Sequence, residues 1–264
     1  MSFAIKQTNN EVVKAVPLLT EKDTRPIKGF QLFPEMNANI FLCAKKKSGK
    51  TSTIFKILQK CCGPSTKIFV FCATLYKDKS WLAIQQWAEK KKIVFIGHTS
   101  LKDDSGVDKL EELVNDLQAK VDTEDEAPPN MLDSSSDEDD EPARPKYQTP
   151  EYIFILDDLS TELKSPTVGR LLKVNRHFLA KTLISSQWLN DLAPGSRKQM
   201  DYFILFRGHM PKKLEKIYKD ANLAITLEQF ISVYKFATEQ PFSFLYIDTT
   251  LGQFRRNFNC LIEF

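Results

Sequence analysis

The chain has 264 residues, of which 42% are hydrophobic and 27% are charged, a composition that excludes a collagen-like, disulfide-rich or wholly disordered protein. Its net charge of +3 conceals a division, because residues 122–142 contain ten acidic residues and no basic residue. Removing these ten from the 34 acidic residues leaves 24 against 37 basic residues, a net charge of +13 for the remainder. Such a basic remainder favours a polyanionic partner such as nucleic acid.

The apolar runs are short, and the longest, such as residues 152–156 and 202–206, fall far below the roughly 20 residues of a membrane-spanning helix. The first residues become polar too soon for a secretory signal. We therefore expect a soluble, intracellular protein with no membrane partner. Five cysteines give an odd count without the spacing of a zinc site, and we expect them to be structural thiols in a reducing compartment.

Strand-like and helix-like segments alternate along the first half of the chain. Residues 1–27 form a lead-in without a clear period. Continuous apolar runs then predict strands over 38–44, 67–72 and 93–96, and helical spacing predicts helices over 51–60, 80–91 and 107–119. This order predicts an α/β fold with a mainly parallel central sheet flanked by helices on both faces.

An acidic stretch at about residues 122–147 interrupts this pattern, and its composition predicts a disordered surface insertion. Beyond it we expect strands over 152–156, 182–185, 202–206 and 244–247, and helices over 161–174, 214–219 and 227–236. A basic segment that contains Arg255 and Arg256 ends the chain. We find no internal repeat, so residues 28–264 are expected to form one domain that carries the insertion.

The first motif lies between the first predicted strand and the helix that follows it. Residues 44–51, Ala-Lys-Lys-Lys-Ser-Gly-Lys-Thr, match the phosphate-binding pattern GxxxxGK[ST], or Walker A, except that Ala44 replaces the first glycine. In such a loop Lys50 reaches the β- and γ-phosphates of ATP and the Thr51 hydroxyl binds Mg²⁺. The expected nucleotide-binding residues are Ala44, Lys45, Lys46, Lys47, Ser48, Gly49, Lys50, Thr51 and Ser52. Alanine is acceptable at position 44 if the backbone there does not need a positive φ.

Two acids end the apolar run 152–156, as in a Walker B strand. Asp157 is the expected magnesium ligand, held directly or through water. Asp158 stands where many ATPases have a glutamate that orients and deprotonates the attacking water. An aspartate is shorter than that glutamate, which slows hydrolysis or demands a tighter site.

A polar pair, Ser186 and Gln187, follows the strand predicted over 182–185. A side chain at the end of this strand can contact the γ-phosphate or the lytic water. We therefore expect Gln187 to act as a catalytic sensor of the bound nucleotide.

The later residues carry a more specific pattern, which runs from Arg176-His177 through Ser186-Gln187 and Pro194 to Arg197, Asp201 and Phe206. It resembles the DNA-packaging ATPases of double-stranded DNA viruses, the poxvirus-type enzymes of the FtsK/HerA superfamily, which have relatives in virophages and polinton-like elements. The resemblance spans about residues 28–250. Gln199 stands where that pattern often has asparagine, and Ala44 replaces a glycine. These two departures from the pattern concern the catalytic rate more than membership of the family.

The resemblance implies a P-loop NTPase fold of the RecA or FtsK/HerA type. It further implies a homo-oligomeric ring, a hexamer or a pentamer, that pulls double-stranded DNA into a capsid by ATP hydrolysis, with capsid proteins as partners and the host-cell assembly site as location. An arginine from one subunit would complete the site of its neighbour. Arg197 is the first candidate and Arg176 the next, and the competing interpretation of Arg197 is a structural salt bridge to Asp201.

Three other functions stay open. A ParA-like ATPase is suggested by Lys45, which has the place of that group's extra signature lysine, although lysines follow it instead of glycines. A nucleotide-binding scaffold that does not hydrolyse ATP is suggested by Ala44 and Asp158. A small P-loop kinase is disfavoured, since no acceptor or lid pattern is recognisable.

Overall fold

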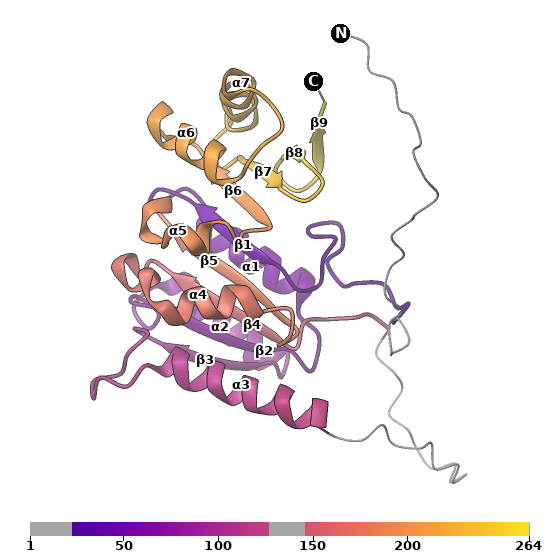
Figure 1. Ribbon diagram of the computed structural model, residues 1–264, viewed down its shortest axis with the longest axis vertical. Coiled ribbons are helices and arrows are strands. Elements are labelled where there is room, and N and C mark those ends of the chain that lie inside the picture. Colours follow the sequence, from indigo (N-terminus) through magenta and orange to yellow (C-terminus); the bar gives the residue numbers. More distant parts are fainter. Residues whose placement is uncertain (1–22, 127–145, 264) are drawn as a thin grey trace, which may run out of the picture.

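A single nine-stranded sheet organises the computed structural model, which describes residues 23–126 and 146–263 (Figure 1). The strand order is β3-β2-β4-β5-β1-β6-β7-β8-β9. Six strands are parallel: β1 (Asn39–Cys43), β2 (Lys67–Cys72), β3 (Val94–His98), β4 (Tyr152–Asp157), β5 (Ala180–Ser186) and β6 (Tyr202–Phe206). Three strands extend the sheet in antiparallel order: β7 (Phe244–Asp248), β8 (Gln253–Arg256) and β9 (Cys260–Ile262).

The register of the parallel strands brings three loops to one edge of the sheet. Cys43 at the end of β1 pairs with Ser186 of β5, and Asp157 at the end of β4 pairs with Ser185. The loops that follow these three strands therefore start side by side at the carboxyl edge, which is the usual place for a ligand in an open α/β sheet.

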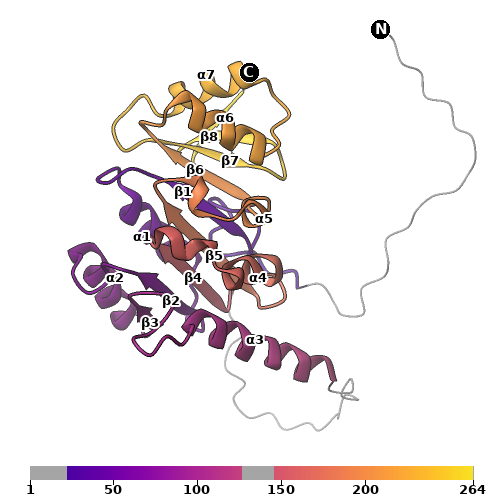
Figure 2. The same ribbon diagram turned by 60° about the vertical axis from the view of Figure 1, so that its left-hand side comes forward.

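Helices cover both faces of the sheet, as Figure 2 shows. One face carries α1 (Lys50–Cys61) and α2 (Lys79–Lys90), and the other carries α3 (Lys109–Glu126), α4 (Pro166–Val174), α6 (Pro211–Asp220) and α7 (Leu227–Ala237). Shorter helical segments are η1 (Ser160–Lys164), η2 (Leu189–Asp191) and α5 (Pro194–Arg197). This two-sided cover explains why the parallel strands are continuous apolar runs.

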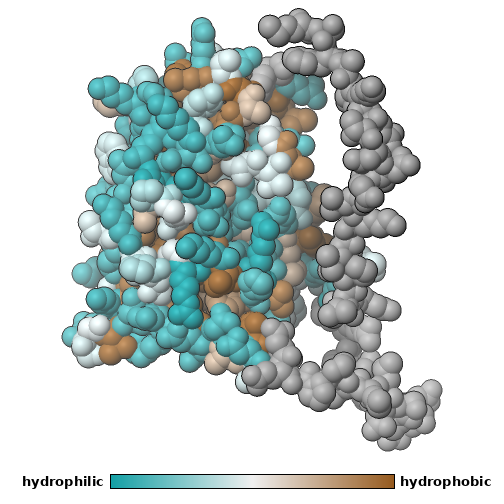
Figure 3. Space-filling view, in the orientation of Figure 1, coloured by the Kyte–Doolittle hydropathy of each residue, from teal (hydrophilic) through white to brown (hydrophobic). Residues whose placement is uncertain are grey.

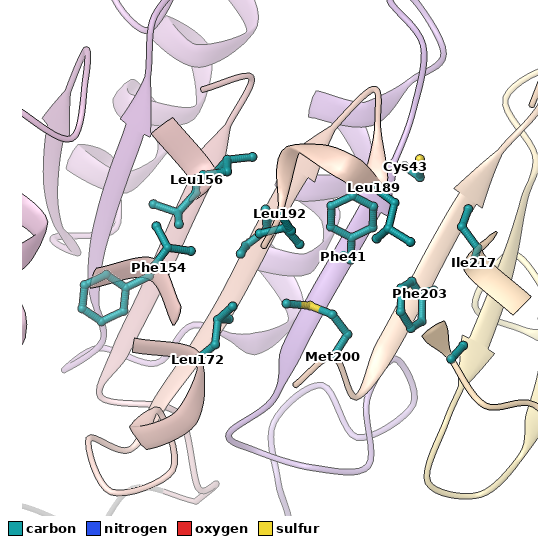
Figure 4. Close-up of a cluster of buried hydrophobic side chains, with 14 of the residues drawn as sticks. Phe41, Cys43, Phe154, Leu156, Leu172, Leu189, Leu192, Met200, Phe203 and Ile217 are labelled. Carbon is teal, nitrogen blue, oxygen red and sulfur yellow. The ribbon is translucent and has the colours of Figure 1, made fainter. Parts of the chain in front are cut away.

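Alternate residues of each strand belong to different cores. Ile40 and Leu42 pack with α1 and α2, whereas Phe41 and Cys43 pack with the helices of the opposite face. Figure 4 shows part of the second core, where Phe41 and Phe203 from the sheet meet Met200 and Ile217. The phosphate-binding segment therefore follows a strand that is buried on both sides.

Local sequence signals set the ends of several helices. Thr226 and Gln229 form a capping box at the start of α7, and the Asp78 side chain accepts a hydrogen bond from the Ser80 backbone N–H at the start of α2. Ser165 caps α4, whose first residue is Pro166. Because Ser165 and Pro166 begin a new helix, the single helix expected over 161–174 is in fact η1 followed by α4.

Helix α3 extends into the segment that was expected to be the insertion. Helix α3 continues to Glu126, so residues 122–126 are helical, which corrects the expected start of the insertion at 122. At the other end, Gln148 pairs with Ile27 in an isolated bridge. Residues 127–145, where most of the expected insertion falls, and residues 1–22 of the expected lead-in lie outside the described residues.

The helix-covered face shown in Figure 3 is mostly hydrophilic, with hydrophobic side chains in small separate groups. Four cysteines, Cys43, Cys61, Cys62 and Cys72, are buried, as expected for thiols in apolar segments, and Cys260 is exposed. No helix among the described residues has the length and apolar character needed to cross a membrane.

Candidate functional site

The phosphate-binding loop has the backbone that the sequence pattern requires. Among the described residues with positive φ, the loop contributes Lys47 at 63° and Gly49 at 94°, but not Ala44. Ala44 is buried just after β1. The condition for an alanine at the first motif position is therefore met. The strain falls instead on Lys47, since a left-handed conformation costs a non-glycine residue about 1–2 kcal/mol.

A cavity of about 440 Å³ opens at the carboxyl edge of the sheet. Eight of the nine expected nucleotide-binding residues line it, together with both expected Walker B acids and three residues near the start of α2: Lys45, Lys46, Lys47, Ser48, Gly49, Lys50, Thr51, Ser52, Asp157, Asp158, Thr74, Asp78 and Ser80. The N-terminus of α1 begins inside this cavity at Lys50. Its free backbone N–H groups and its dipole favour an anion such as phosphate.

Lys50 joins the two motifs. Its Nζ lies 2.8 Å from Asp157 Oδ1 and 2.6 Å from Asp158 Oδ2. Burial alone would lower the pKa of Lys50, but the two carboxylates outweigh burial and raise that pKa above its ordinary value. The lysine is therefore charged at neutral pH and forms ion pairs with both acids. Either acid can exchange this pairing for another cation.

Asp157 is held from its other side by residues that sequence patterns did not single out. The indole N–H of Trp81 in α2 donates to Asp157 Oδ2 at 3.2 Å, and the Cys72 thiol lies 3.8 Å from the same oxygen. Burial, with the nearby carboxylate, raises the pKa of the Cys72 thiol to about 11, so the thiol stays protonated and can donate its S–H to Asp157. Trp81 and Cys72 thus fix one oxygen of Asp157 and leave the other to pair with Lys50.

Asp158 reaches the cavity because its backbone is left-handed, with φ at 53°. Its backbone N–H donates to the Ser185 carbonyl at 3.1 Å, which fixes the turn after β4 against β5. The Asp158 side chain is 39% exposed, compared with 4% for Asp157. The two neighbouring acids therefore differ: Asp157 is a buried, oriented carboxylate, and Asp158 is a carboxylate within reach of water.

The donor set fits Mg²⁺ bound together with a phosphate. The Thr51 hydroxyl and the carboxylates of Asp157 and Asp158 line one cavity and supply the oxygen ligands that Mg²⁺ prefers. In residues 23–126 and 146–263 there is no cluster of three or more His, Cys, Asp or Glu side chains that could hold a metal ion.

Gln187 directly follows β5, beside the phosphate-binding loop, and is half-buried. Its carbonyl oxygen accepts a hydrogen bond from Lys213 Nζ of α6 and lies 3.7 Å from the Cys43 thiol. The residue does not line the cavity, although the Ala44 N–H donates to the Ser186 carbonyl beside it. Gln187 follows β5 directly, but its role as a sensor stays a prediction.

His209 contacts the end of β1, just before the phosphate-binding loop. Its Nε2 is 3.0 Å from the Cys43 carbonyl at the end of β1, and its backbone N–H donates to the Tyr234 hydroxyl at 3.0 Å. Burial, with the charges of Lys213 and Lys45, lowers the pKa of His209 to about 4. The ring is therefore neutral at pH 7, and its Nε2–H donates to the Cys43 carbonyl.

The two candidate arginines lie away from the cavity. Arg197 in α5 is only 7% exposed, and its Nη1 donates to Asp220 Oδ2 at 2.9 Å. The expected alternative, a salt bridge from Arg197 to Asp201, is wrong, because Asp201 is bound by Arg176 at 3.1 Å instead. The geometry favours a structural role for Arg197, since a buried guanidinium is not presented to a neighbouring subunit. Arg176 is more exposed, but it lies at the amino edge of the strands.

Of the comparisons with known proteins, the one with solved structures bears on the fold. No known protein family matches the sequence, and no curated protein matches it either. Among solved structures, the genome-packaging NTPase B204 of Sulfolobus turreted icosahedral virus 2 in complex with AMP is 20% identical, with a TM-score of 0.55 over 84% of this chain and 98% of that chain.

Two related structures give similar values. The same NTPase in complex with AMPPCP is 20% identical, with a TM-score of 0.55 over 87% of this chain and 100% of that chain. The DNA-packaging ATPase B204 from Sulfolobus turreted icosahedral virus is 19% identical, with a TM-score of 0.53 over 83% of this chain and 96% of that chain. This similarity confirms the expected fold: the chain is an α/β protein with the P-loop NTPase fold of these packaging enzymes.

Proposed function

We propose that the protein is an ATP-driven motor that moves double-stranded DNA into a capsid. The observation that carries the proposal is the contact of Lys50 with both Asp157 and Asp158 inside the cavity at the carboxyl edge. A lysine for phosphate, a buried acid for the metal and a second, water-accessible acid are the parts that nucleotide hydrolysis needs.

Each group has a distinct task in this proposal. The backbone N–H groups of residues 45–52 and the amine of Lys50 bind the phosphates of ATP. Thr51 and Asp157 hold Mg²⁺, which when bound neutralises charge that develops on the phosphates. When Lys50 turns to the phosphates, Asp158 is released to orient and deprotonate the attacking water. Gln187 contacts the γ-phosphate or that water from the end of β5.

Double-stranded DNA is the proposed partner for two reasons. The chain without its acidic stretch carries a net charge of +13, which suits a polyanion. The solved structures of similar fold include one described as a DNA-packaging ATPase. We further propose a homo-oligomeric ring that docks on capsid proteins at the host-cell assembly site, with an arginine other than the buried Arg197 completing the neighbouring site.

Steady-state ATP hydrolysis with and without double-stranded DNA tests the function, with Lys50→Ala as the inactive control. We expect magnesium-dependent turnover that double-stranded DNA accelerates. Turnover that DNA leaves unchanged would contradict the motor. Tight ATP binding without turnover would favour a non-hydrolysing scaffold. Asp158 supports that alternative, because an aspartate is shorter than the glutamate that many ATPases have at this position.

A further inference from the structure

A second cavity adjoins the phosphate site. Its volume is about 960 Å³, and it shares two wall residues, Gly49 and Ser52, with the cavity that holds Lys50. It runs along the side of α1, past Thr53 and Lys56, toward the antiparallel end of the sheet. A molecule with its phosphates at the start of α1 therefore has an adjoining space for its remaining part.

Three of the eleven residues that line this second cavity are phenylalanines from the C-terminal part of the chain: Phe242, Phe244 and Phe258. Phe244 opens β7, Phe258 lies between β8 and β9, and their ring centroids are 5.0 Å apart. Phe242 is 70% exposed and reaches the phosphate-binding loop, since a Cβ added to Gly49 would lie 3.4 Å from Phe242 Cδ1. An aromatic ring is thus held in solvent at the junction of the two cavities.

Phe242 is also unusual in its backbone, with φ at 61°. A bulky residue is rare in this conformation, and residues in such costly conformations cluster at ligand-binding sites. The combination of exposure, strain and contact with Gly49 is difficult to explain by packing, because most of the Phe242 ring buries nothing. It suits a ring that gains its contacts when a flat ligand stacks on it.

Asn257 gives the cavity an oriented polar group. Its Oδ1 accepts a hydrogen bond from the Phe244 backbone N–H at 3.2 Å, which fixes which end of the amide is the oxygen. Within the described ranges 23–126 and 146–263, the Asn257 amide nitrogen donates to no protein acceptor. Two N–H donors are therefore available beside the aromatic walls, as the acceptor nitrogens of a purine require.

We propose that this second cavity binds the purine base of the nucleotide, with Phe242 as the stacking surface and Asn257 as the donor to the base edge. The inference rests on the proposed function, because it places the base relative to phosphates on Lys50. The volume of the second cavity, about 960 Å³, lies within the range of small-molecule pockets. In this arrangement the C-terminal strands, and not the phosphate-binding loop, select the class of base.

The test compares ATP, CTP and inorganic tripolyphosphate, each with Mg²⁺, by equilibrium binding to the full chain. We expect the unmodified protein to bind ATP most tightly, then CTP, then tripolyphosphate. Phe242→Ala should weaken ATP binding roughly tenfold, the scale of one base stacked on an aromatic ring, and leave tripolyphosphate binding unchanged. Phe236→Ala is the matched control, since Phe236 is 54% exposed but does not line the cavity.

A second variant addresses the base edge. Asn257→Asp keeps the oxygen that accepts from Phe244 but removes the amide donors, so the ratio of ATP to tripolyphosphate affinity should fall. Using the ratio removes the effect of the added charge on the phosphates. Unchanged tripolyphosphate binding in Phe242→Ala also shows that this variant is folded.

The failures are distinguishable. If the unmodified protein binds tripolyphosphate as tightly as ATP, the base site is wrong and the phosphate site stands. If Phe242→Ala weakens both ligands equally, Phe242 shapes the loop and does not stack on a base, which also overturns the inference. If neither ligand binds, the proposed function itself is wrong.

Discussion

The two edges of the parallel sheet use aspartates in opposite ways. At the carboxyl edge, Asp157 and Asp158 face one amine, Lys50, in an open cavity. At the amino edge, Asp201 accepts from the Asn39 backbone N–H at 2.8 Å and from Arg176 at 3.1 Å. The first arrangement can exchange its partner for a cation, whereas the second fixes the position of β1 beside β6.

Other contacts extend this difference. The Asn39 amide donates to the carbonyls of Leu172 and Gln199, and the buried Lys181 donates to the Glu35 carbonyl. These bonds join strands and loops to one another at the amino edge. Arg176 and Asp201, two members of the pattern that resembles the packaging ATPases, therefore hold the strands together at the amino edge. Ser186 and Gln187, from the same pattern, lie at the opposite, carboxyl edge.

The largest expected effect comes from removing the charge at the carboxyl edge. Lys50→Ala should lower ATP turnover by at least about 10²–10³-fold, since no other described side chain contacts both acids. Steady-state phosphate release measures the loss, and a melting curve shows whether the fold is kept. Turnover near that of the unmodified protein would exclude the phosphate-binding assignment.

Asp158→Asn should nearly abolish turnover and preserve ATP binding, because the amide cannot deprotonate water but still lines the cavity. The matched control is Asp201→Asn, the same substitution at the amino edge, which should lower thermal stability and leave turnover of the folded protein unchanged. Parallel loss of binding and turnover in Asp158→Asn would make Asp158 a magnesium ligand or a structural group.

Arg197→Ala should mainly destabilise the protein, by about 3 kcal/mol, because it leaves the Asp220 carboxylate without its buried partner. Denaturant unfolding measures this loss. Mixing Arg197→Ala subunits with Lys50→Ala subunits then tests a role between subunits. We expect the mixture to turn over ATP no faster than its Arg197→Ala subunits do alone, and faster turnover at any ratio would show that Arg197 acts on a neighbouring site.

The last effect concerns pH, and it is absent near neutral pH. His209 is neutral in the folded protein down to about pH 4, whereas an unfolded histidine takes up a proton below about pH 6.5. The folded state should therefore lose up to about 3 kcal/mol of stability as the pH falls from 6.5 to 4. His209→Gln should reduce this loss in denaturant titrations at several pH values, and an equal loss in both proteins would contradict the assignment.

The fold was predictable where each element is buried on two sides. Strands such as β4 and β6 are continuous apolar runs, so their type and nearly their bounds follow from the sequence. The sequence does not predict β8 and β9, because both strands are short. β8 has four residues, three of them polar, and β9 has only three residues. The acidic composition of residues 122–126 predicts that they belong to the insertion, although they continue helix α3.

The site was predictable only in its local part. The loop from Lys45 to Ser52 and the acids after β4 follow from spacing, because each motif is contiguous in the chain. Trp81 and Phe242 could not be found this way, since neither belongs to a contiguous motif and a single aromatic residue usually indicates core. What distinguishes them is a partner far along the sequence, Asp157 for Trp81 and Gly49 for Phe242.

The bond from Trp81 to Asp157 also gives the protein an optical reporter. The indole is 1% exposed, and its N–H touches the carboxylate that is proposed to exchange Lys50 for Mg²⁺. Indole emission responds to the electric field at the ring, and this exchange changes the nearest charge. Trp188, which is 58% exposed, supplies a solvent-facing signal in the same molecule. The exchange of Lys50 for Mg²⁺ at Asp157 would thus change the tryptophan fluorescence of the unlabelled protein.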